Sequence, residues 1–532
     1  MLIVTLIEAL ALSWLRLFIG IVISILLAFG LGILAGVNRT AERIIIPLID
    51  ILQSIPILGF FPVAVLFFIT FFPIIGAEMA AVFLIITSQL WNLIFAVYES
   101  VKSIPSYILE TVELSKLSVL QKIAKVYIPS SWPRIIDNLP LSWAGGLFFL
   151  SSSEIISLGT TSYQLLGIGS MTFILFSLGD YNDIAIAFLL LFLALVATHM
   201  LFFRPLNIWS QKFKYETTAE ATAKVPWFIS SFFRTTKPLK ILAKHVFIPR
   251  RPLAPIFKKQ YAEPPYTLES HEKDKIISLS KLIKFFKWII TPIFIILILL
   301  GVFLDLKAII NIVNYYFKQD MLLLLVTSAA YSALRIAIAT AIMLPIIFLA
   351  ILAVTNSFTK RFLLPIFLFL ASFPAPMFIP YMFILFGNNV ELISIAVIIS
   401  GSIWYIFYNT YSSLRLLPSD LKEVVELSKL SKLQKFTKLY LPAMLPGLVT
   451  GLVTAIGGAW NALIVAEWIQ IGNSVYSVNF GLGKILDEAA NIGDLNLLYA
   501  SLLFMVIIVV LLDRLFWKRL YNYVTNKFKY ET

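Results

Sequence analysis

The sequence predicts an all-α polytopic membrane protein, built from two homologous transmembrane helical halves in one chain. Hydrophobic residues make up 60% of its 532 positions and charged residues 13%, whereas soluble domains carry roughly 45–50% apolar and about 25% charged residues. Apolar surface on this scale needs lipid as its solvent. The composition therefore excludes an ordinary soluble enzyme, a disordered chain and a fibrous protein.

The apolar runs provide about five spans in the first half of the chain and six in the second. A helix of about 20 apolar residues crosses a bilayer core of roughly 30 Å. Several runs are longer than this and contain proline, so we expect tilted or broken helices. The expected spans are 12–36, 45–72, 76–97, 136–158 and 183–203, followed by 284–304, 322–353, 362–387, 390–411, 444–467 and 497–517.

The longest polar stretch, 204–287, carries 17 Lys and Arg against 6 Asp and Glu. Its many prolines argue against a packed domain, and we interpret it as a tether, not as a nucleic-acid surface. Because basic loops stay in the cytoplasm, we expect the linker and the C-terminus inside and the N-terminus outside. The predicted plan for this multi-pass plasma-membrane protein is a first half at 1–204, a cytoplasmic linker at 205–283 and a second half at 284–532.

An internal repeat links the two halves. At an offset of 313, residues 105–133 match residues 418–446 with 17 identities in 29 positions. This best-matching part is a predicted cytoplasmic loop, although loops ordinarily vary more than the elements that they connect. We therefore interpret both loops as docking elements for two equivalent cytosolic partners.

Each loop has the pattern of two short helices. In the first copy, Ser118-x-x-Gln121 fits the capping box that begins a new helix. Pro129 is expected to end that helix, because proline cannot donate the backbone hydrogen bond that would continue it. The equivalent residues of the second copy are Ser431, Gln434 and Pro442.

These loops resemble the EAA loop of binding-protein-dependent ABC importer permeases. The spacing from Glu110 to Pro129, and from Glu423 to Pro442, is that of the family. The two alanines of the family pattern are replaced, and a lysine stands at its glycine position in both copies. The resemblance implies an ATPase-coupling role for Glu110, Glu113, Lys116, Ser118, Gln121 and Pro129, and for Glu423, Glu426, Lys429, Ser431, Gln434 and Pro442.

A second resemblance narrows the match to nitrate-, sulfonate- and taurine-type permeases. It lies in the span after the second loop, at 445–467, and in the proline-rich run at 372–380. The family implies a type I importer fold, two copies of a cytosolic ABC ATPase and an external substrate-binding protein. The chain has no G-x-x-x-x-G-K-[ST] loop, so we expect ATP and Mg on the partner ATPase subunits, no cofactor on this chain, and lipid but no nucleic acid as a further partner.

A few polar side chains within the spans are candidates for the translocation pathway. Charges there are costly unless they line water or find a partner. Snorkelling or a structural pair is the alternative for the two arginines, and core packing is the alternative for the tryptophan and asparagine. The candidates are Arg16, Glu154, Arg335, Trp460, Asn461 and Glu467.

The function predicted from these patterns is the membrane subunit of an ATP-driven importer, which moves a small solute inward by alternating access. Arg16, Arg335 and the resemblance favour an anion such as a sulfonate or nitrate. A fused iron or thiamine permease is the alternative substrate class, and a secondary transporter with parallel repeats is the alternative mechanism. An intramembrane enzyme is disfavoured, because the chain has no Cys and 3 His and shows no reactive constellation.

Overall fold

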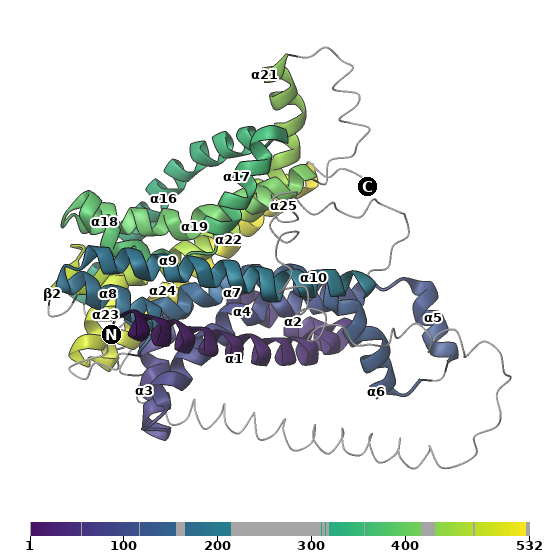
Figure 1. The fold of residues 1–532 in the computed structure, drawn as a ribbon, viewed down its shortest axis with the longest axis horizontal. Coiled ribbons are helices and arrows are strands. Elements are labelled where there is room, and N and C mark those ends of the chain that lie inside the picture. Colours follow the sequence, from purple (N-terminus) through teal and green to yellow (C-terminus); the bar gives the residue numbers. More distant parts are fainter. Residues whose placement is uncertain are drawn as a thin grey trace.

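The computed structural model describes residues 2–54, 56–115, 117–155, 165–213, 310, 314, 319–355, 357–415, 431–471 and 474–527. Within these ranges the chain forms two repeated helical halves and a two-stranded hairpin (Figure 1). Seven of the described helices are long and apolar enough to cross a membrane. The predicted all-α polytopic fold with two homologous halves is thereby confirmed.

The first half begins with the 36-residue helix α1 and the 16-residue helix α2, and it ends in a short 3-10 turn. Its π-helical turns are η2 and η3, and its 3-10 turns are η1 and η4. In chain order its elements are α1 (Leu2–Val37), α2 (Arg39–Ser54), η1 (Ile57–Phe60), α3 (Phe61–Phe71), α4 (Gly76–Lys102), α5 (Ser106–Leu114), α6 (Val119–Lys122), η2 (Ile123–Tyr127), α7 (Ile128–Ile155), α8 (Ile168–Leu178), α9 (Tyr181–Thr198), η3 (His199–Phe203), α10 (Arg204–Ser210) and η4 (Gln211–Phe213).

The second half repeats this order and adds a hairpin. Strands β1 and β2 pair antiparallel, with Trp468 opposite Ser477. Its elements are α16 (Gln319–Thr355), α17 (Ser357–Leu370), η5 (Ala375–Phe378), α18 (Ile379–Phe386), α19 (Val390–Arg415), α21 (Lys432–Lys435), η6 (Phe436–Tyr440), α22 (Leu441–Glu467), β1 (Trp468–Ile471), β2 (Ser474–Ser477), α23 (Leu482–Ile492), α24 (Leu495–Leu512), η7 (Asp513–Trp517) and α25 (Lys518–Lys527).

Two predicted spans, 45–72 and 362–387, are not continuous helices. Helix α2 ends at Ser54 and α17 at Leu370. Pro56 and Pro374 follow with extended backbone, with φ and ψ of −62° and 108°, and of −70° and 119°, and they cap the next turns η1 and η5. A proline removes a helical hydrogen bond, so each segment restarts as a 3-10 turn followed by a short helix. The predicted span at 284–304 lies outside the described residues, and so does nearly all of the predicted linker.

Helices α8 and α23 and the β1–β2 hairpin have no counterpart among the predicted spans. Helices α8 and α23 have 11 residues each, too few for the length of about 20 residues used to recognise a span. The β1–β2 hairpin, of four residues per strand, directly follows a span that was predicted to end at Glu467. These elements depend on tertiary packing more than on their own hydropathy.

The halves interlock through their broken segments. Leu58, Phe61 and Val65, from η1 and α3, belong to the buried cluster formed mainly by the second half. In return, Met377 of η5 belongs to the buried cluster of the first half, with Phe373 packed against it. The proline breaks thus let each half place a short apolar segment in the core of the other.

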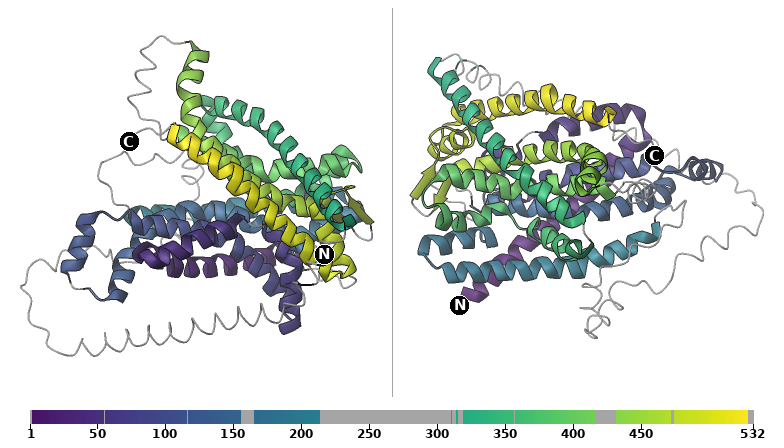
Figure 2. Two further views of the ribbon diagram at one scale, coloured as in Figure 1. Left: turned by 180° about the vertical axis from the view of Figure 1, so that it is seen from behind. Right: turned by 90° about the horizontal axis from the view of Figure 1, so that it is seen from above.

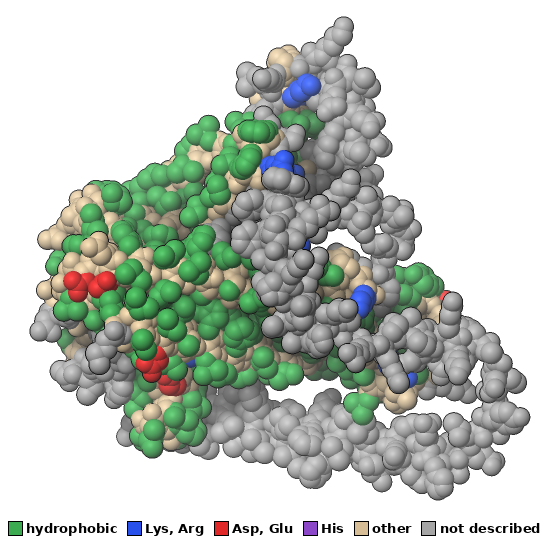
Figure 3. Space-filling model, viewed as in Figure 1, with side chains coloured by type: hydrophobic (Ala, Val, Ile, Leu, Met, Phe, Trp, Pro, Cys, Tyr) green, Lys and Arg blue, Asp and Glu red, His purple; other side chains and the backbone are tan. Residues whose placement is uncertain are grey.

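The two halves meet at one end and diverge at the other, as the views of Figure 1 and Figure 2 agree. Helices α8, α18 and α23 lie where the halves meet, which we name the closed end. Helices α5, α6 and α21 lie on separate arms at the other, open end. On the face shown in Figure 3 the surface is largely apolar, with acidic side chains mainly at the closed end and basic ones toward the open end.

Close approach of helices α19 and α22 requires glycine. A Cβ atom at Gly451 would lie 2.7 Å from the Cα atom of Ile406, on backbone that cannot rotate away. Gly457 lies in the same helix, but a Cβ atom there would meet no other atom within 4 Å. A comparison of these two positions therefore separates the cost of crowding the neighbouring helix from the gain in helix propensity when glycine is replaced.

We expect Gly451→Ala to lower the free energy of unfolding by about 1–3 kcal/mol, because it forces α19 and α22 apart. Gly457→Ala is the matched control and should stabilise the helix by about 0.5–1 kcal/mol. The measurement is the midpoint of thermal unfolding of each purified variant in one detergent. Equal midpoints for the two variants would contradict this account of the packing.

Candidate functional site

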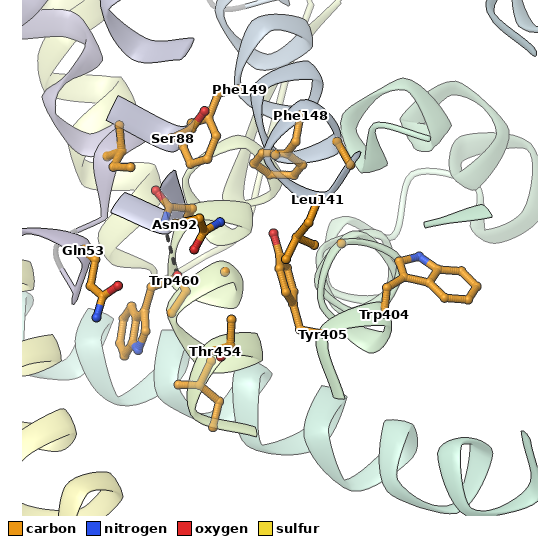
Figure 4. Close-up of a pocket in the computed structure, with 18 of the residues that line it drawn as sticks. Gln53, Ser88, Asn92, Leu141, Phe148, Phe149, Trp404, Tyr405, Thr454 and Trp460 are labelled. Atoms are coloured by element: carbon orange, nitrogen blue, oxygen red, sulfur yellow. Dashed lines mark hydrogen bonds between the residues drawn. The ribbon is translucent and has the colours of Figure 1, made fainter. Parts of the chain in front are cut away.

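A cavity of about 540 Å³ lies between the two halves. Its lining comes from the end of α2, η1, α4 and α7 of the first half, and from η5, α19, α22, α24 and η7 of the second. In Figure 4, Phe148 and Tyr405 approach each other from opposite halves, while Trp460 and Gln53 border another part of the same cavity. The cavity is therefore a shared space that neither half encloses alone.

Two of the predicted pathway residues, Trp460 and Asn461, line this cavity. Trp460 is almost fully buried, with 1% of its surface exposed. The side chain of Asn461 accepts a hydrogen bond from the backbone N–H of Leu58 at 3.1 Å and donates one to the carbonyl of Gly457 at 3.1 Å. Asn461 thus accepts a backbone N–H at the start of η1, which belongs to the opposite half. This bond helps to hold the two halves together beside the cavity.

The four charged candidates do not line the cavity. In the first half, Arg16 donates two hydrogen bonds to Glu78, from Nε at 2.5 Å and from an Nη at 2.6 Å. Its other Nη contacts Glu154 at 3.1 Å and the carbonyl of Leu166 at 2.9 Å. We name this group the first charge cluster; it is a structural ion-pair network within one half, the alternative stated above for the arginine.

The second half contains the same arrangement, which we name the second charge cluster. Arg335 donates hydrogen bonds to both oxygens of Glu391 at 2.6 Å. Its remaining Nη contacts Glu467 at 2.7 Å. Both arginines and both intramembrane glutamates are buried, with exposed fractions of 4% or less, so each charge depends on its partners for compensation.

Each buried glutamate also anchors the helix that follows it. Glu154, near the end of α7, accepts a hydrogen bond from the backbone N–H of Gly169 at 2.8 Å, in the first turn of α8. A hydroxyl completes the contact, because Ser13 donates to Glu154 at 2.6 Å and accepts from the N–H of Ile168 at 3.1 Å. The carboxylate and the Ser13 hydroxyl each satisfy one N–H group that the first turn leaves unpaired, and α1, α7 and α8 are joined as one unit.

The second cluster repeats these bonds in detail. Glu467 accepts from the backbone N–H of Gly483 at 2.8 Å and from Ser332 at 2.7 Å, and Ser332 accepts from the N–H of Leu482 at 3.0 Å. The residue before the helix must be glycine, since a Cβ atom at Gly481 would clash with the carboxylate of Glu467. Gly167 meets Glu154 in the same way.

The partners of these arginines were not predicted from the sequence. They are Glu78 and Glu391, which are themselves equivalent at the repeat offset of 313. The sequence therefore does contain a signal. When an acidic residue and an arginine both recur in the two halves, an ion pair between them in each half can be predicted. The cavity residues Gln53, Asn92 and Tyr405 were also missed, because polar or aromatic identity alone does not show which helix face meets the other half.

Both predicted capping boxes are present in the loops at the open end. Ser118 Oγ accepts from the N–H of Gln121 at 3.3 Å, and Gln121 returns a bond to the N–H of Ser118 at 2.9 Å. In the second loop the corresponding distances between Ser431 and Gln434 are 3.2 Å and 3.0 Å. The start of this helix is therefore determined locally and in the same way in both halves.

Pro129 and Pro442 do not end these helices, contrary to the prediction. Each follows a π-helical turn, η2 or η6, and lies at the start of the long helix α7 or α22. In the first loop the N–H of Ile128 reaches back to the carbonyl of Ile123. The wider turn shifts the hydrogen-bond pattern, so that the proline falls in a first turn, where its missing N–H is tolerated.

Helix α5 presents its acidic residues outward. Glu110 and Glu113 are exposed, whereas Val112 is buried against Ile104 and Val126. This small apolar cluster fixes α5 to the helix that enters the membrane core. The predicted coupling residues Lys116, Glu423, Glu426 and Lys429 lie outside the described residues.

The family described as "Binding-protein-dependent transport system inner membrane component" matches the chain twice, at residues 20–208 and 345–529. Both matches include an open-end loop and a charge-cluster glutamate. The duplicated geometry and the duplicated family match therefore coincide.

Individual relatives match the chain over about 150 to 165 residues. SsuC of Bacillus subtilis, provisionally named an aliphatic sulfonates transport permease protein, is 27% identical over 31% of this chain and 57% of its own length. The nitrate import permease protein NrtB of Leptolyngbya laminosa is 31% identical over 28% and 51%. The bicarbonate transport system permease protein CmpB of Synechococcus elongatus is 30% identical over 28% and 51%. The chain thus spans just over half the length of these relatives.

The charge clusters predict that replacing a buried arginine destabilises the protein much more than replacing an exposed one. We expect Arg335→Leu to cost about 3–5 kcal/mol of stability, because it leaves the buried carboxylate of Glu467 without its cation. Arg134→Leu is the control, since Arg134 and Glu99 form an exposed pair at 3.1 Å and such pairs contribute about 0–1 kcal/mol. The check is the urea concentration that half-unfolds each variant in detergent; similar midpoints would refute a structural role for the clusters.

Proposed function

The chain belongs to the family of binding-protein-dependent transport system inner membrane components, and from this premise we propose that it is the permease subunit of an ABC importer. One observation carries the proposal. A cavity shared by two repeated halves lies between them, and a matching capping-box loop stands on each arm at the open end. This arrangement suits a pathway whose two walls are moved by two equivalent cytosolic subunits.

The proposed orientation places the open end in the cytoplasm and the closed end outside. Basic residues gather at the open-end loops and acidic residues near the closed end (Figure 3), in keeping with the positive-inside rule. The N-terminal end of α1 then lies outside, while the linker and the end of α25 lie inside. In this orientation the structure corresponds to an inward-facing state, with the cavity between arms that diverge toward the cytoplasm.

Alternating access follows from this geometry. Two copies of a cytosolic ABC ATPase, which hold ATP and Mg, would grip the α5–α6 loop and its counterpart before α22. Closure of the ATPases would bring the two arms together and open the cavity at the outer end, where a substrate-binding protein delivers the solute. The charge clusters support this transmission, because the first ties α1, α7 and α8 into one unit and the second ties α16, α22 and α23.

The substrate proposed from the relatives is a small anion, since their names specify sulfonates, nitrate and bicarbonate. A secondary transporter would need intramembrane carboxylates that are able to exchange a coupling ion. Glu154 and Glu467 are engaged by an arginine, a serine and a backbone N–H each. This engagement favours the importer over a secondary transporter.

The coupling role of the loops can be tested by charge reversal. We expect the double variant Glu110→Arg and Glu423→Arg to lose at least tenfold of the co-purifying P-loop ATPase from native membranes in mild detergent. The reason is that an acidic contact becomes repulsive toward a partner that carries complementary charge. The readouts are mass spectrometry of the pull-down and its ATPase activity.

Asp320→Arg is the matched control, because Asp320 is exposed in the first turn of α16, at the opposite end of the molecule. It should leave co-purification unchanged. A wild-type chain that purifies without any ATPase and moves solute in liposomes without ATP would overturn the importer proposal.

A further inference from the structure

The two arginines that the sequence favours for an anion do not serve the cavity. Arg16 and Arg335 are each held by two carboxylates of their own charge cluster. Neither of them is among the residues that line the space between the halves. An anion that rests in this space therefore takes its contacts from other side chains of the lining.

Several polar side chains of the lining already donate within their own helices. Ser88 Oγ, Ser400 Oγ and Thr454 Oγ1 donate to backbone carbonyls three or four positions earlier, at 2.7, 2.9 and 3.0 Å. Asn461 likewise donates to the carbonyl of Gly457. None of these four donors can turn to a solute without giving up a bond that it already has.

Asn92 and Tyr405 differ from these residues. They are equivalent at the repeat offset of 313, and both line the cavity with partly exposed side chains. Neither side chain has a hydrogen-bond partner among the described residues. In Figure 4 they point toward one another, Asn92 from α4 and Tyr405 from α19. The cavity is therefore flanked by one uncommitted donor group from each half, because a carboxamide carries two N–H donors and a phenol one O–H.

Two neutral donors on opposite sides suit a small oxyanion. Such an ion has only acceptor oxygens, so it can receive one hydrogen bond on each side. A hydrogen bond to a charged partner is stronger than one between neutral groups, and the pair therefore provides real attraction. A neutral donor nevertheless holds an anion less tightly than an arginine would, which suits a pathway that has to release what it binds.

The volume of the cavity agrees with a partly hydrated ion. It measures about 540 Å³, whereas one water occupies about 30 Å³ in the liquid. An ion between the two donors can keep water on its remaining sides. It then avoids most of the cost of stripping a charge of its hydration, and neutral contacts are sufficient.

The two acidic residues of the described lining lie nearer the open end than the donor pair. Arg134, one turn before Asp137 on α7, pairs with Glu99, which lies two turns beyond Asn92 on α4. Asp513 follows the last residue of α24, a helix that begins next to α23 at the closed end. Both carboxylates thus border the mouth of the cavity, while the donors lie deeper, where less repulsion acts on an anion.

We propose that Asn92 and Tyr405 together hold the transported solute, a small oxyanion, by donating hydrogen bonds to different oxygens of the ion. This assignment rests on the proposed function, because it takes the cavity as the translocation pathway and an anion as the solute. The pair bridges the two halves, so a motion that separates α4 from α19 withdraws one donor from the ion. Release is thereby linked to the motion that opens and closes the cavity.

The test is calorimetric titration of the purified full chain in lipid nanodiscs, with nitrate and methanesulfonate as separate probes and gluconate as the buffer anion. We expect Tyr405→Phe and Asn92→Leu each to raise the dissociation constant of both probes about tenfold, because each removes one donor and nearly keeps the side-chain shape. The thermal unfolding midpoint should stay at the wild-type value in both variants, since neither side chain bonds to another described residue.

Tyr331→Phe is the matched control, because Tyr331 is exposed on α16, stacks on Phe480 and does not line the cavity. It should bind both probes as the wild type does. Wild-type affinity in either cavity variant, or no binding of either probe to the wild type, would overturn the assignment.

A charge substitution gives a readout that a merely structural role would not move. Asn92→Asp keeps the size of the side chain but adds a negative charge, so binding of nitrate should be weaker than in Asn92→Leu. Asn388→Asp is its control, since Asn388 is exposed directly after α18 at the closed end; its affinity should match that of the wild type. Nitrate bound as tightly by Asn92→Asp as by Asn92→Leu would place the anion elsewhere.

These measurements fail independently of the importer proposal. Binding is measured on the chain alone, without ATPase or ATP, whereas the importer proposal depends on co-purification of an ATPase. Loss of ATPase capture with weakened binding in both cavity variants would remove the importer mechanism only. Capture of the ATPase with wild-type affinity in the cavity variants would remove the roles of Asn92 and Tyr405 only.

Discussion

The pairing of one buried arginine with two carboxylates is the interaction on which the rest of each half depends. A guanidinium has a fixed fork of donors, and here it joins a half-exposed glutamate in the first turn of α4 or α19 to a fully buried one near the end of α7 or α22. The buried glutamate in turn accepts one backbone N–H of the next helix, and a serine hydroxyl accepts its neighbour. Four segments distant in sequence therefore share one electrostatic centre.

This centre ties helices of the closed end together within each half. Its bonds lie within each half, so they need not break when the halves move relative to each other. Contacts between the halves are of a different kind, consisting of apolar segments released by Pro56 and Pro374 and the hydrogen bond from Leu58 to Asn461. Rigid units with a largely apolar interface are suited to a motion that closes the cavity at one end and opens it at the other.

The cavity has a different origin from the repeat that surrounds it. The charge clusters are nearly identical in both halves, but the cavity lining is not, since Phe148 occupies the repeat position of Asn461. Duplication supplied two equivalent walls and two equivalent capping-box loops. The residues between the walls diverged, which allows one asymmetric solute to meet different groups on its two sides.

The sequence by itself determined the features that depend on local chemistry or composition. Apolar length placed most spans, the offset of 313 revealed the two halves, and Ser118 with Gln121 specified a helix start that needs no distant partner. Only the tertiary structure decided which charges pair, where the prolines break the spans, and which residues face the cavity. The physical reason is distance: Arg16 meets Glu154 across 138 positions and Asn461 meets Leu58 across 403, and hydropathy carries no information about which helix faces meet.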